Sequence, residues 1–405
     1  MIPPRADVVV AGGGTAGIAA AVAAARAGAE TLLIERAGGL GGMAFSALVH
    51  TLCGLYRLRA DACAPLEFAN TGFPREFAER LIAGGAACAP VRMGRLDVLP
   101  HRPVGLARMA DRITAGQPRL RVFFHTDIVS VSAGGGRVAG VRVQCRGREQ
   151  EVEAGALVDA SGDAGVSVMA GAGFEIAPEE RLQRPAYIFG LGGVAAGAVG
   201  ERERLRLAGA ISSGVSSGRL PAEMLGVSFR QGLSPGEVWA SIDQDPSPYD
   251  PCSPECLTGI EREGRRLADE LVGFLRENAG GFSHAYAAAM PACAGIRESR
   301  RVTGEACLTA EAILLGTACD DPAAVASWPL ELRETAKGPR LKFPEGDRMA
   351  GIPRGCLVAR GFVNLFVAGR CISCTHDAQA SIRVTGTCMA TGEAAGRAAA
   401  AALTT

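Results

Sequence analysis

The sequence predicts an α/β fold in which a parallel sheet is extended by a β-meander and an α+β domain is inserted before the sheet is completed. Three observations lead to this prediction. A continuous apolar run at 7–11 passes through glycines directly into an Ala-rich stretch, as a buried parallel strand passes into a helix. Short β-type runs separated by turns fill 120–160. After a stretch of different composition, a strand and an Ala-rich helix return at 364–403.

The elements follow in order from local signals. The first helix is predicted to end near Ala27 with Gly28 as its C-cap, and the next strand, 31–34, ends at Glu35. Residues 36–60 are rich in glycine and lack clean periodicity, which predicts a long loop. Helices are expected near 74–83 and 103–115. The glycines at 134–136 are predicted to form a hairpin turn.

These patterns predict a domain that is split by an insertion. The first part of the cofactor domain covers 1–172 and its C-terminal part covers 346–405. Between them, 173–345 has many prolines and mixed helical patterns, which indicates an inserted substrate domain.

Composition excludes several classes of protein. The 42 basic residues equal the 42 acidic residues, so nothing indicates nucleic-acid binding. No apolar run approaches the length of a membrane span, and the first strand begins too early for a secretory signal. Thirteen cysteines without disulfide spacing indicate reduced thiols in the cytoplasm.

A glycine fingerprint predicts a dinucleotide site between the first strand and the first helix. Gly12 permits the tight turn, Gly14 lets the backbone approach a pyrophosphate, and Gly17 lets the helix pack closely on the strand. The N-terminus of the helix, with Thr15 and Ala16, offers N–H groups to phosphate oxygens. Glu35, 18 positions after Gly17, is predicted to accept hydrogen bonds from an adenosine ribose.

This fingerprint does not separate FAD from NAD, but later segments offer the additional contacts that a flavin needs. The segment 36–44 is expected to follow the pyrophosphate and ribityl chain, while the strand ends at 160–162 and 369–370 and the helix near 386 are expected to lie at the flavin. Besides the fingerprint residues, the predicted cofactor-binding residues are Arg36, Gly41, Gly42, Met43, Ile128, Ala160, Ser161, Gly162, Gly369, Arg370, Gly386 and Thr387.

These residues carry a resemblance to a known family. The segments DVVVAGGGTAGIAAAVAAARAGAETLLIER, GGLGGMA and ALVDASGDAGV resemble the glutathione-reductase-like flavoproteins. GIRESRRVTGE (295–305) and NLFVAGRCISCTHDAQASIRVTGTCMATGEAAGRAAA (364–400) are similar to the FAD-dependent oxidoreductase family, related to the flavin-binding component of heterodisulfide reductase and distantly to fumarate reductase flavoproteins. The resemblance implies FAD, a Rossmann-like core and a second domain that contains a β-sheet. It does not imply a substrate.

Two positions depart from the wider superfamily. Arg370 stands where many members have an Asp that holds a ribityl hydroxyl. Between Glu35 and Val49 there is no histidine for covalent attachment, so FAD is expected to bind non-covalently.

The remaining motifs predict a dehydrogenase or oxidase that acts on a small organic molecule. Only one glycine fingerprint lies between a strand and a helix, so a separate NAD(P)H domain is not expected, and the electron acceptor is oxygen, a quinone or a carrier protein. His376 is expected either to take a proton as hydride leaves or to contact FAD, and His50 is a weaker candidate. Arg297 and Arg383 are expected either to bind a substrate carboxylate or, for Arg297, to lie on a solvent-facing strand.

Two other hypotheses remain open. Cys371 and Cys374 form a CxxC that would serve a flavin-linked thiol–disulfide reductase. The third hypothesis is an electron-carrier protein of a larger complex, although the sequence has no four-Cys run for an iron–sulfur cluster. Cys252 and Cys256 lack a second pair at zinc spacing, so no metal site is predicted.

Overall fold

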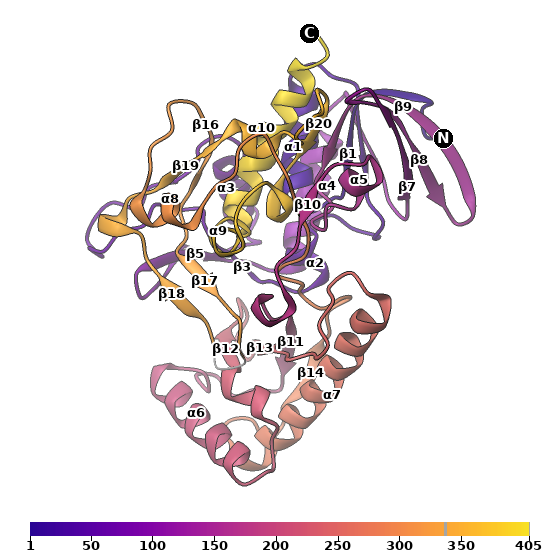
Figure 1. Cartoon of the computed structure of the whole chain (residues 1–405). Helices are drawn as coiled ribbons and strands as arrows, with labels where there is room; N and C mark the ends of the chain where they lie inside the picture. The colour runs from indigo at the N-terminus through magenta and orange to yellow at the C-terminus, as the bar shows by residue number, and fades with distance from the viewer. Residues whose placement is uncertain (336–337, 405) are drawn as a thin grey trace.

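The computed structural model describes residues 1–335 and 338–404, and it shows an α/β protein built on a seven-stranded sheet (Figure 1). The strand order is β6-β2-β1-β9-β8-β7, and β20 also pairs with β9. The strands are β1 Arg5–Ala11, β2 Thr31–Ile34, β6 Leu120–Phe123, β7 Asp127–Gly134, β8 Arg137–Cys145, β9 Arg148–Asp159 and β20 Leu365–Val367. The α/β class predicted from the sequence is therefore confirmed.

β9 joins the parallel and antiparallel halves of this sheet. Its first residues, 148–153, pair with β8 in antiparallel register, and 153–159 pair in parallel with β1. The meander consists of β7, β8 and β9. The prediction that the segment from 120 also belongs to the meander is wrong, because β6 pairs in parallel with β2 at the edge of the sheet. β6 is four residues long, too short for its pattern to show which partner it pairs with.

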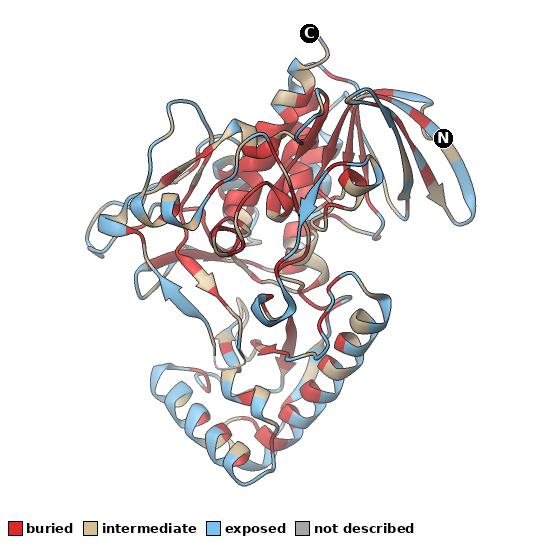
Figure 2. Cartoon of the chain, viewed as in Figure 1, coloured by how far each residue is buried: buried red, intermediate tan, exposed pale blue. Residues whose placement is uncertain are grey.

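Helices cover the parallel strands and meet closely. α1 (Thr15–Arg26) lies against α10 (Thr385–Ala401), and Figure 2 shows this region as largely buried. A Cβ at Gly392 or Gly396 would lie 2.1 Å from the carbonyl oxygen of Ala16 or Ala20. Such a separation is a steric clash, so only glycine permits this approach of the two helices. The predicted helices near 74–83 and 103–115 are present as α3 (Phe73–Ala83) and α4 (Pro103–Ala115).

The segment 36–60, predicted as a loop, contains two short elements. α2 covers Met43–Ser46, and β3 covers Thr51–Leu52. β3 pairs with β5 (Leu96–Pro100), which also pairs with β4 (Val91–Met93). Elements of two and four residues are too short to show a helical or strand period, so they left no signal in the sequence.

A lower lobe, residues 186–289, has its own sheet and core (Figure 1). The sheet order is β12-β13-β11-β14, and two helices, α6 and α7, flank it. The bounds are β11 Ala186–Gly192, β12 Ser228–Gln231, β13 Val238–Asp243, β14 Tyr286–Ala289, α6 Glu201–Ser216 and α7 Pro254–Asn278. Tyr187, Phe189 and Phe282 are completely buried in the core of this lobe.

The chain between the lower lobe and β20 packs on the main sheet. Val302, Ile313 and Ile352 belong to the same hydrophobic cluster as β9 and β20. The elements of this segment are β15 Arg301–Val302, α8 Ala310–Leu315, β16 Pro322–Ala326, β17 Leu330–Leu332, β18 Arg340–Lys342 and β19 Ala350–Pro353. Two short elements precede the lower lobe, α5 Gly165–Met169 and β10 Phe174–Glu175, and α9 His376–Ile382 follows β20. The insertion over 173–345 stays a prediction. Among the described residues, no helix has the length and apolarity needed to cross a bilayer.

Candidate active site

The glycine fingerprint forms a tight turn from β1 into α1. Gly12 has a φ of +95°, and a Cβ there would lie 2.7 Å from the carbonyl oxygen of Ala160. A Cβ at Gly17 would lie 1.8 Å from the carbonyl oxygen of Gly12. Both positions therefore require glycine, for the backbone conformation or for the close approach. Thr15 and Ala16 form the first turn of α1, where the N–H groups have no partner within the helix.

Glu35 lies beside this turn at the end of β2. Its carboxylate accepts hydrogen bonds from the N–H groups of Gly13, at 2.5 Å, and Ala37, at 2.6 Å. The side chain is buried, with 8% exposed. Glu35 thus holds the glycine turn in place, a role that sequence reasoning missed. Its predicted contact with a ribose stays a prediction.

The segment after Glu35 returns across the turn. The N–H of Gly41 donates to the carbonyl of Gly13, and a Cβ at Gly42 would lie 2.8 Å from the Cα of Gly14. Gly41 and Gly42 both have positive φ, at +122° and +52°. The two glycine segments therefore touch through backbone alone. Of the other predicted cofactor residues at this end, Met43 begins α2, Arg36 is exposed and Ile128 is half-buried in β7.

Arg370 connects two strand ends. Its guanidinium pairs with the carboxylate of Asp163 at 2.5 Å and donates to the carbonyl of Gly162 at 2.7 Å and to that of Ile296. Burial alone would raise the pKa of Asp163, but Arg370 and a hydrogen bond from Ser299 outweigh it and hold that pKa below its usual value. Arg370 therefore fixes the turn after β9, where Ala160 and Ser161 lie, against the turn after β20.

The N-terminus of α10 lies at the same end of the sheet. A Cβ at Gly386 would lie 2.4 Å from the carbonyl oxygen of Gly54, so the chain around 54 crosses this helix end in backbone contact. The Thr387 hydroxyl is fully buried and has no hydrogen-bond partner in the described part of the chain. Gly369, with a φ of +78°, approaches the side chain of Ala16.

These features fit a bound dinucleotide with a flavin. Backbone-only contacts between 12–14 and 41–42 suit a pyrophosphate, and an unsatisfied buried hydroxyl at a helix N-terminus suits the polar edge of a flavin ring. The family model described as FAD dependent oxidoreductase matches residues 7–405. The chain belongs to this family. It is an FAD-dependent oxidoreductase, and FAD is its cofactor. No curated protein gives a significant match to the sequence.

Several solved flavoenzyme structures are similar at low identity. A geranylgeranyl bacteriochlorophyll reductase-like protein from Thermoplasma acidophilum is 14% identical with a TM-score of 0.45, and the match covers 98% of this chain and 77% of that chain. p-Nitrophenol 4-monooxygenase from Pseudomonas putida DLL-E4 is 12% identical with a TM-score of 0.45, and the match covers 75% of this chain and 71% of that chain. Anhydrotetracycline hydroxylase from Streptomyces rimosus is 16% identical with a TM-score of 0.43, and the match covers 75% of this chain and 54% of that chain.

The structure places Arg297 and Arg383 in one buried polar region between the main sheet and the lower lobe. Arg297 pairs with Asp243 of β13 at 2.7 Å. Arg383 donates to the side-chain oxygen of Gln183 at 3.1 Å and to the carbonyl of Glu331 at 3.2 Å. Its Nε has no partner among the described residues. Burial lowers the pKa of Arg383 to about 10, although Glu331 acts against this.

The structure corrects the solvent-facing alternative for Arg297. Glu298 is fully buried and pairs with Arg301 at 2.6 Å, and Arg297 faces Asp243. The alternation of charges was compatible with an exposed strand, but each of these three charges has a buried partner of opposite sign.

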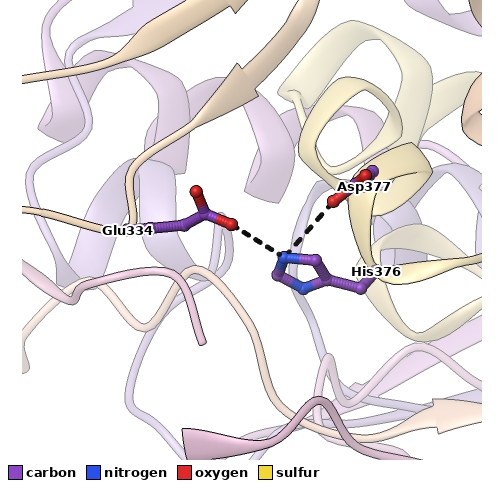
Figure 3. A group of neighbouring side chains, drawn as sticks. All are labelled: Glu334, His376 and Asp377. Carbon is purple, nitrogen blue, oxygen red and sulfur yellow. Dashed lines mark ion pairs between the residues drawn. The ribbon is translucent and has the colours of Figure 1, made fainter. Parts of the chain in front are cut away.

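His376 is the first residue of α9, whose N-cap, Thr375, accepts from the N–H of Ala378. Its Nδ1 lies 2.7 Å from a carboxylate oxygen of Glu298. Its Nε2 faces Glu334 and Asp377 (Figure 3). His50, the weaker candidate, stacks on Trp239 with ring centroids 5.2 Å apart, and burial lowers its pKa to about 3.

Cys371 and Cys374 are both buried and unpaired. Burial raises the pKa of each thiol well above its ordinary value. A redox-active dithiol needs a thiolate near neutral pH, so this environment opposes the thiol–disulfide hypothesis.

Sequence reasoning missed further charged residues that surround Arg297 and Arg383. Arg333 pairs with Asp243 at 2.8 Å and with Glu331 at 2.7 Å. Arg230 of β12 is near both Arg333 and Glu331, and the only side-chain hydrogen bond described for it is a donation to the sulfur of Met93. We call Arg230, Asp243, Arg297, Glu331, Arg333 and Arg383 the arginine cluster.

Proposed function

We propose that this enzyme transfers hydride between a small organic carboxylate and non-covalently bound FAD. The substrate would lie between the main sheet and the lower lobe, at the arginine cluster. The observation that carries this proposal is the charge of the cluster: four arginines stand against two carboxylates, in a region where each side chain is buried or half-buried.

The excess positive charge of the cluster comes from the two arginines that have no ion pair among the described residues. Arg297 pairs with Asp243, and Arg333 pairs with both Asp243 and Glu331. Arg230 and Arg383 have no ion pair in the described part of the chain, and burial lowers the pKa of both. A buried cation without an ion pair is unfavourable, so an anion that binds beside these arginines would be stabilised. A carboxylate fits a guanidinium through two parallel hydrogen bonds.

When bound, FAD supplies the hydride acceptor or donor. The chain's own residues then have separate tasks: Arg230 and Arg383 bind and orient the carboxylate, and Asp243 and Glu331 keep the neighbouring arginines in place. Binding through fixed charges on rigid elements restricts the substrate to one orientation, which contributes to rate as well as to affinity.

The sequence-based role of His376 as proton acceptor remains a separate proposal, and it requires that the Nε2 lone pair be free to face the substrate. The narrower relationship to heterodisulfide reductase and the identity of the electron acceptor also remain proposals. So does a cytoplasmic location, which is supported by thirteen cysteines that are all unpaired.

Anaerobic reduction of the FAD-loaded enzyme tests the proposal. Small carboxylic acids are compared with their amides, and flavin bleaching is followed near 450 nm. We expect a carboxylate to bleach the flavin and its amide to fail. Arg383→Met should weaken the binding of the carboxylate by about 1.5–3 kcal/mol, roughly tenfold or more.

The exposed Arg142→Met is the matched control, because the ion pairs of Arg142 in the described part of the chain are with surface glutamates. Amides that reduce the flavin as fast as the acids, or an Arg383→Met variant with unchanged KM and kcat, would overturn the carboxylate assignment. Acid precipitation should leave FAD in the supernatant; flavin that remains with the chain would contradict non-covalent binding.

A further inference from the structure

Three side chains from distant parts of the sequence meet at the start of α9. His376 and Asp377 open the helix, and Glu334 follows β17 (Figure 3). Each offers one ligand atom, and the three atoms all lie within 4.8 Å of one another. Imidazole nitrogen and carboxylate oxygen are both ligands of Zn²⁺ in proteins.

The histidine is oriented for such a role. The carboxylate of Glu298 lies 2.7 Å from Nδ1 and so fixes the proton there, which leaves the lone pair on Nε2. The imidazole is buried, with 8% exposed, and Nε2 has no hydrogen-bond partner within residues 1–335 and 338–404. Histidines that bind metal ions generally donate their other ring N–H to a carboxylate or carbonyl, as His376 does.

Glu298 itself is held firmly. One of its oxygens also accepts from Arg301 at 2.6 Å, and the other accepts from the N–H of Gln183 at 3.2 Å. The carboxylate is fully buried, so these contacts keep it in one position and His376 in one orientation.

The two distances from the histidine to the carboxylates suit a metal ion better than hydrogen bonds. Nε2 lies 3.5 Å from a carboxylate oxygen of Glu334 and 3.5 Å from one of Asp377. Hydrogen bonds from nitrogen to oxygen are about 2.7–3.2 Å long. Ligands about 2.0–2.2 Å from a tetrahedral Zn²⁺ are about 3.3–3.6 Å apart.

Both carboxylates also have an arginine partner. Arg340 donates to the other oxygen of Glu334 at 3.0 Å, and among the described residues no hydrogen bond is made to the first oxygen. Arg181 donates at 2.9 Å to the same oxygen of Asp377 that faces His376, and this pair is exposed. These arginines hold the carboxylates in place, and only the contact of Arg181 competes with an ion.

We propose that Glu334, His376 and Asp377 bind one Zn²⁺ ion, with Glu298 orienting the histidine. The ion joins the segment after β17 to the first turn of α9. The three ligands leave a fourth position for water.

Metal counting on the full-length, FAD-loaded protein tests this. The wild type and His376→Ala are stripped with a chelator and dialysed against buffered Zn²⁺, and zinc and flavin are then measured per chain. We expect the wild type to hold one Zn²⁺ more than His376→Ala. Both proteins have the same thirteen cysteines, so zinc bound by exposed thiols cancels in the difference. Mg²⁺ and Ca²⁺ should not compete, because they prefer sites made of oxygen alone.

Further variants guard against misfolding. Glu334 is about one quarter exposed, so Glu334→Ala should fold and should also lose the extra zinc. Glu298→Gln should bind zinc about 10–100-fold more weakly, the usual effect of changing a residue that orients a ligand. His284→Ala, an exposed histidine of the lower lobe, should keep it. Equal zinc in the wild type, His376→Ala and Glu334→Ala overturns the proposal, as does competition by Mg²⁺ or Ca²⁺ at equal concentration.

Discussion

Replacing Glu35 separates its observed role in the glycine turn from its predicted contact with a ribose. Its carboxylate accepts from Gly13 and Ala37 at 2.5 and 2.6 Å while buried beside the glycine turn. Each hydrogen bond to a charged group contributes about 1.5–3 kcal/mol, so Glu35→Ala removes up to roughly 3–6 kcal/mol of folding free energy. Glu35→Gln keeps one oxygen of similar position and should retain much of the stability.

The two variants should differ in stability but should weaken FAD binding by similar amounts. Either variant removes the hydrogen bond between a ribose hydroxyl and the carboxylate, which costs about 1.5–3 kcal/mol of binding free energy and weakens FAD binding roughly 10–100-fold. The assay is titration of the apoprotein with FAD, followed by flavin fluorescence, with Tm measured in parallel. Glu30→Gln is the control, because Glu30 forms an exposed pair with Arg119 just before β2. Wild-type FAD affinity in Glu35→Gln would refute the ribose contact, and an unchanged Tm in Glu35→Ala would refute the turn-holding role.

Three further predictions concern electron supply, thiols and pH. NADH and NADPH should bleach the flavin slowly or not at all, because the sequence has one glycine fingerprint; fast, saturable bleaching would contradict this. Cys374→Ser should leave turnover near the wild-type rate, since burial raises the pKa of this thiol, and loss of turnover would restore the dithiol mechanism. Burial lowers the pKa of His101 to about 4, so the unfolded chain binds more protons than the folded chain below pH 6.5. As the pH falls from 6.5 to 5, the free energy of unfolding should therefore fall by about 2 kcal/mol per such histidine. A dependence of Tm on pH that is the same in the wild type and in His101→Gln would exclude this.

The parts of the site that could be predicted from the sequence are those built from neighbouring residues. The turn over 12–17 combines a strand, three glycines and a helix within a few positions, so the spacing alone fixes the geometry. The arginine cluster has no such local signal. Arg230, Asp243 and Glu331 come from β12, β13 and β17, and their encounter depends on how the lower lobe packs against the main sheet. For Arg297 and Arg383 the residue type suggested a role, but their partners are remote in the chain and left no pattern.

The two proposals for His376 exclude each other, and their consequences differ. As a proton acceptor, His376 needs Nε2 free toward a substrate, and His376→Ala should slow flavin reduction by about 10²–10⁴-fold without any change in bound metal. As a zinc ligand, it holds the start of α9, and its loss should remove one ion. Glu298 serves either role equally well, because both need the proton on Nδ1. Measuring bound zinc and the rate of flavin reduction on the same His376→Ala sample therefore shows whether the Nε2 lone pair accepts a proton or binds zinc.

In the proposed function, cofactor binding and substrate selection involve largely different parts of the chain. The glycine turns and the start of α10 contact their neighbours through backbone, and substitution at several of these glycines meets other atoms within 3 Å. Arg230 and Asp243 instead lie on strands of the lower lobe, which has a core of its own. Under the proposed function, changes on β12 and β13 would therefore alter the charge at the proposed substrate site and leave the glycine turns unchanged. Through such a lobe, a family defined by its cofactor can diverge in substrate while its cofactor-binding core stays the same.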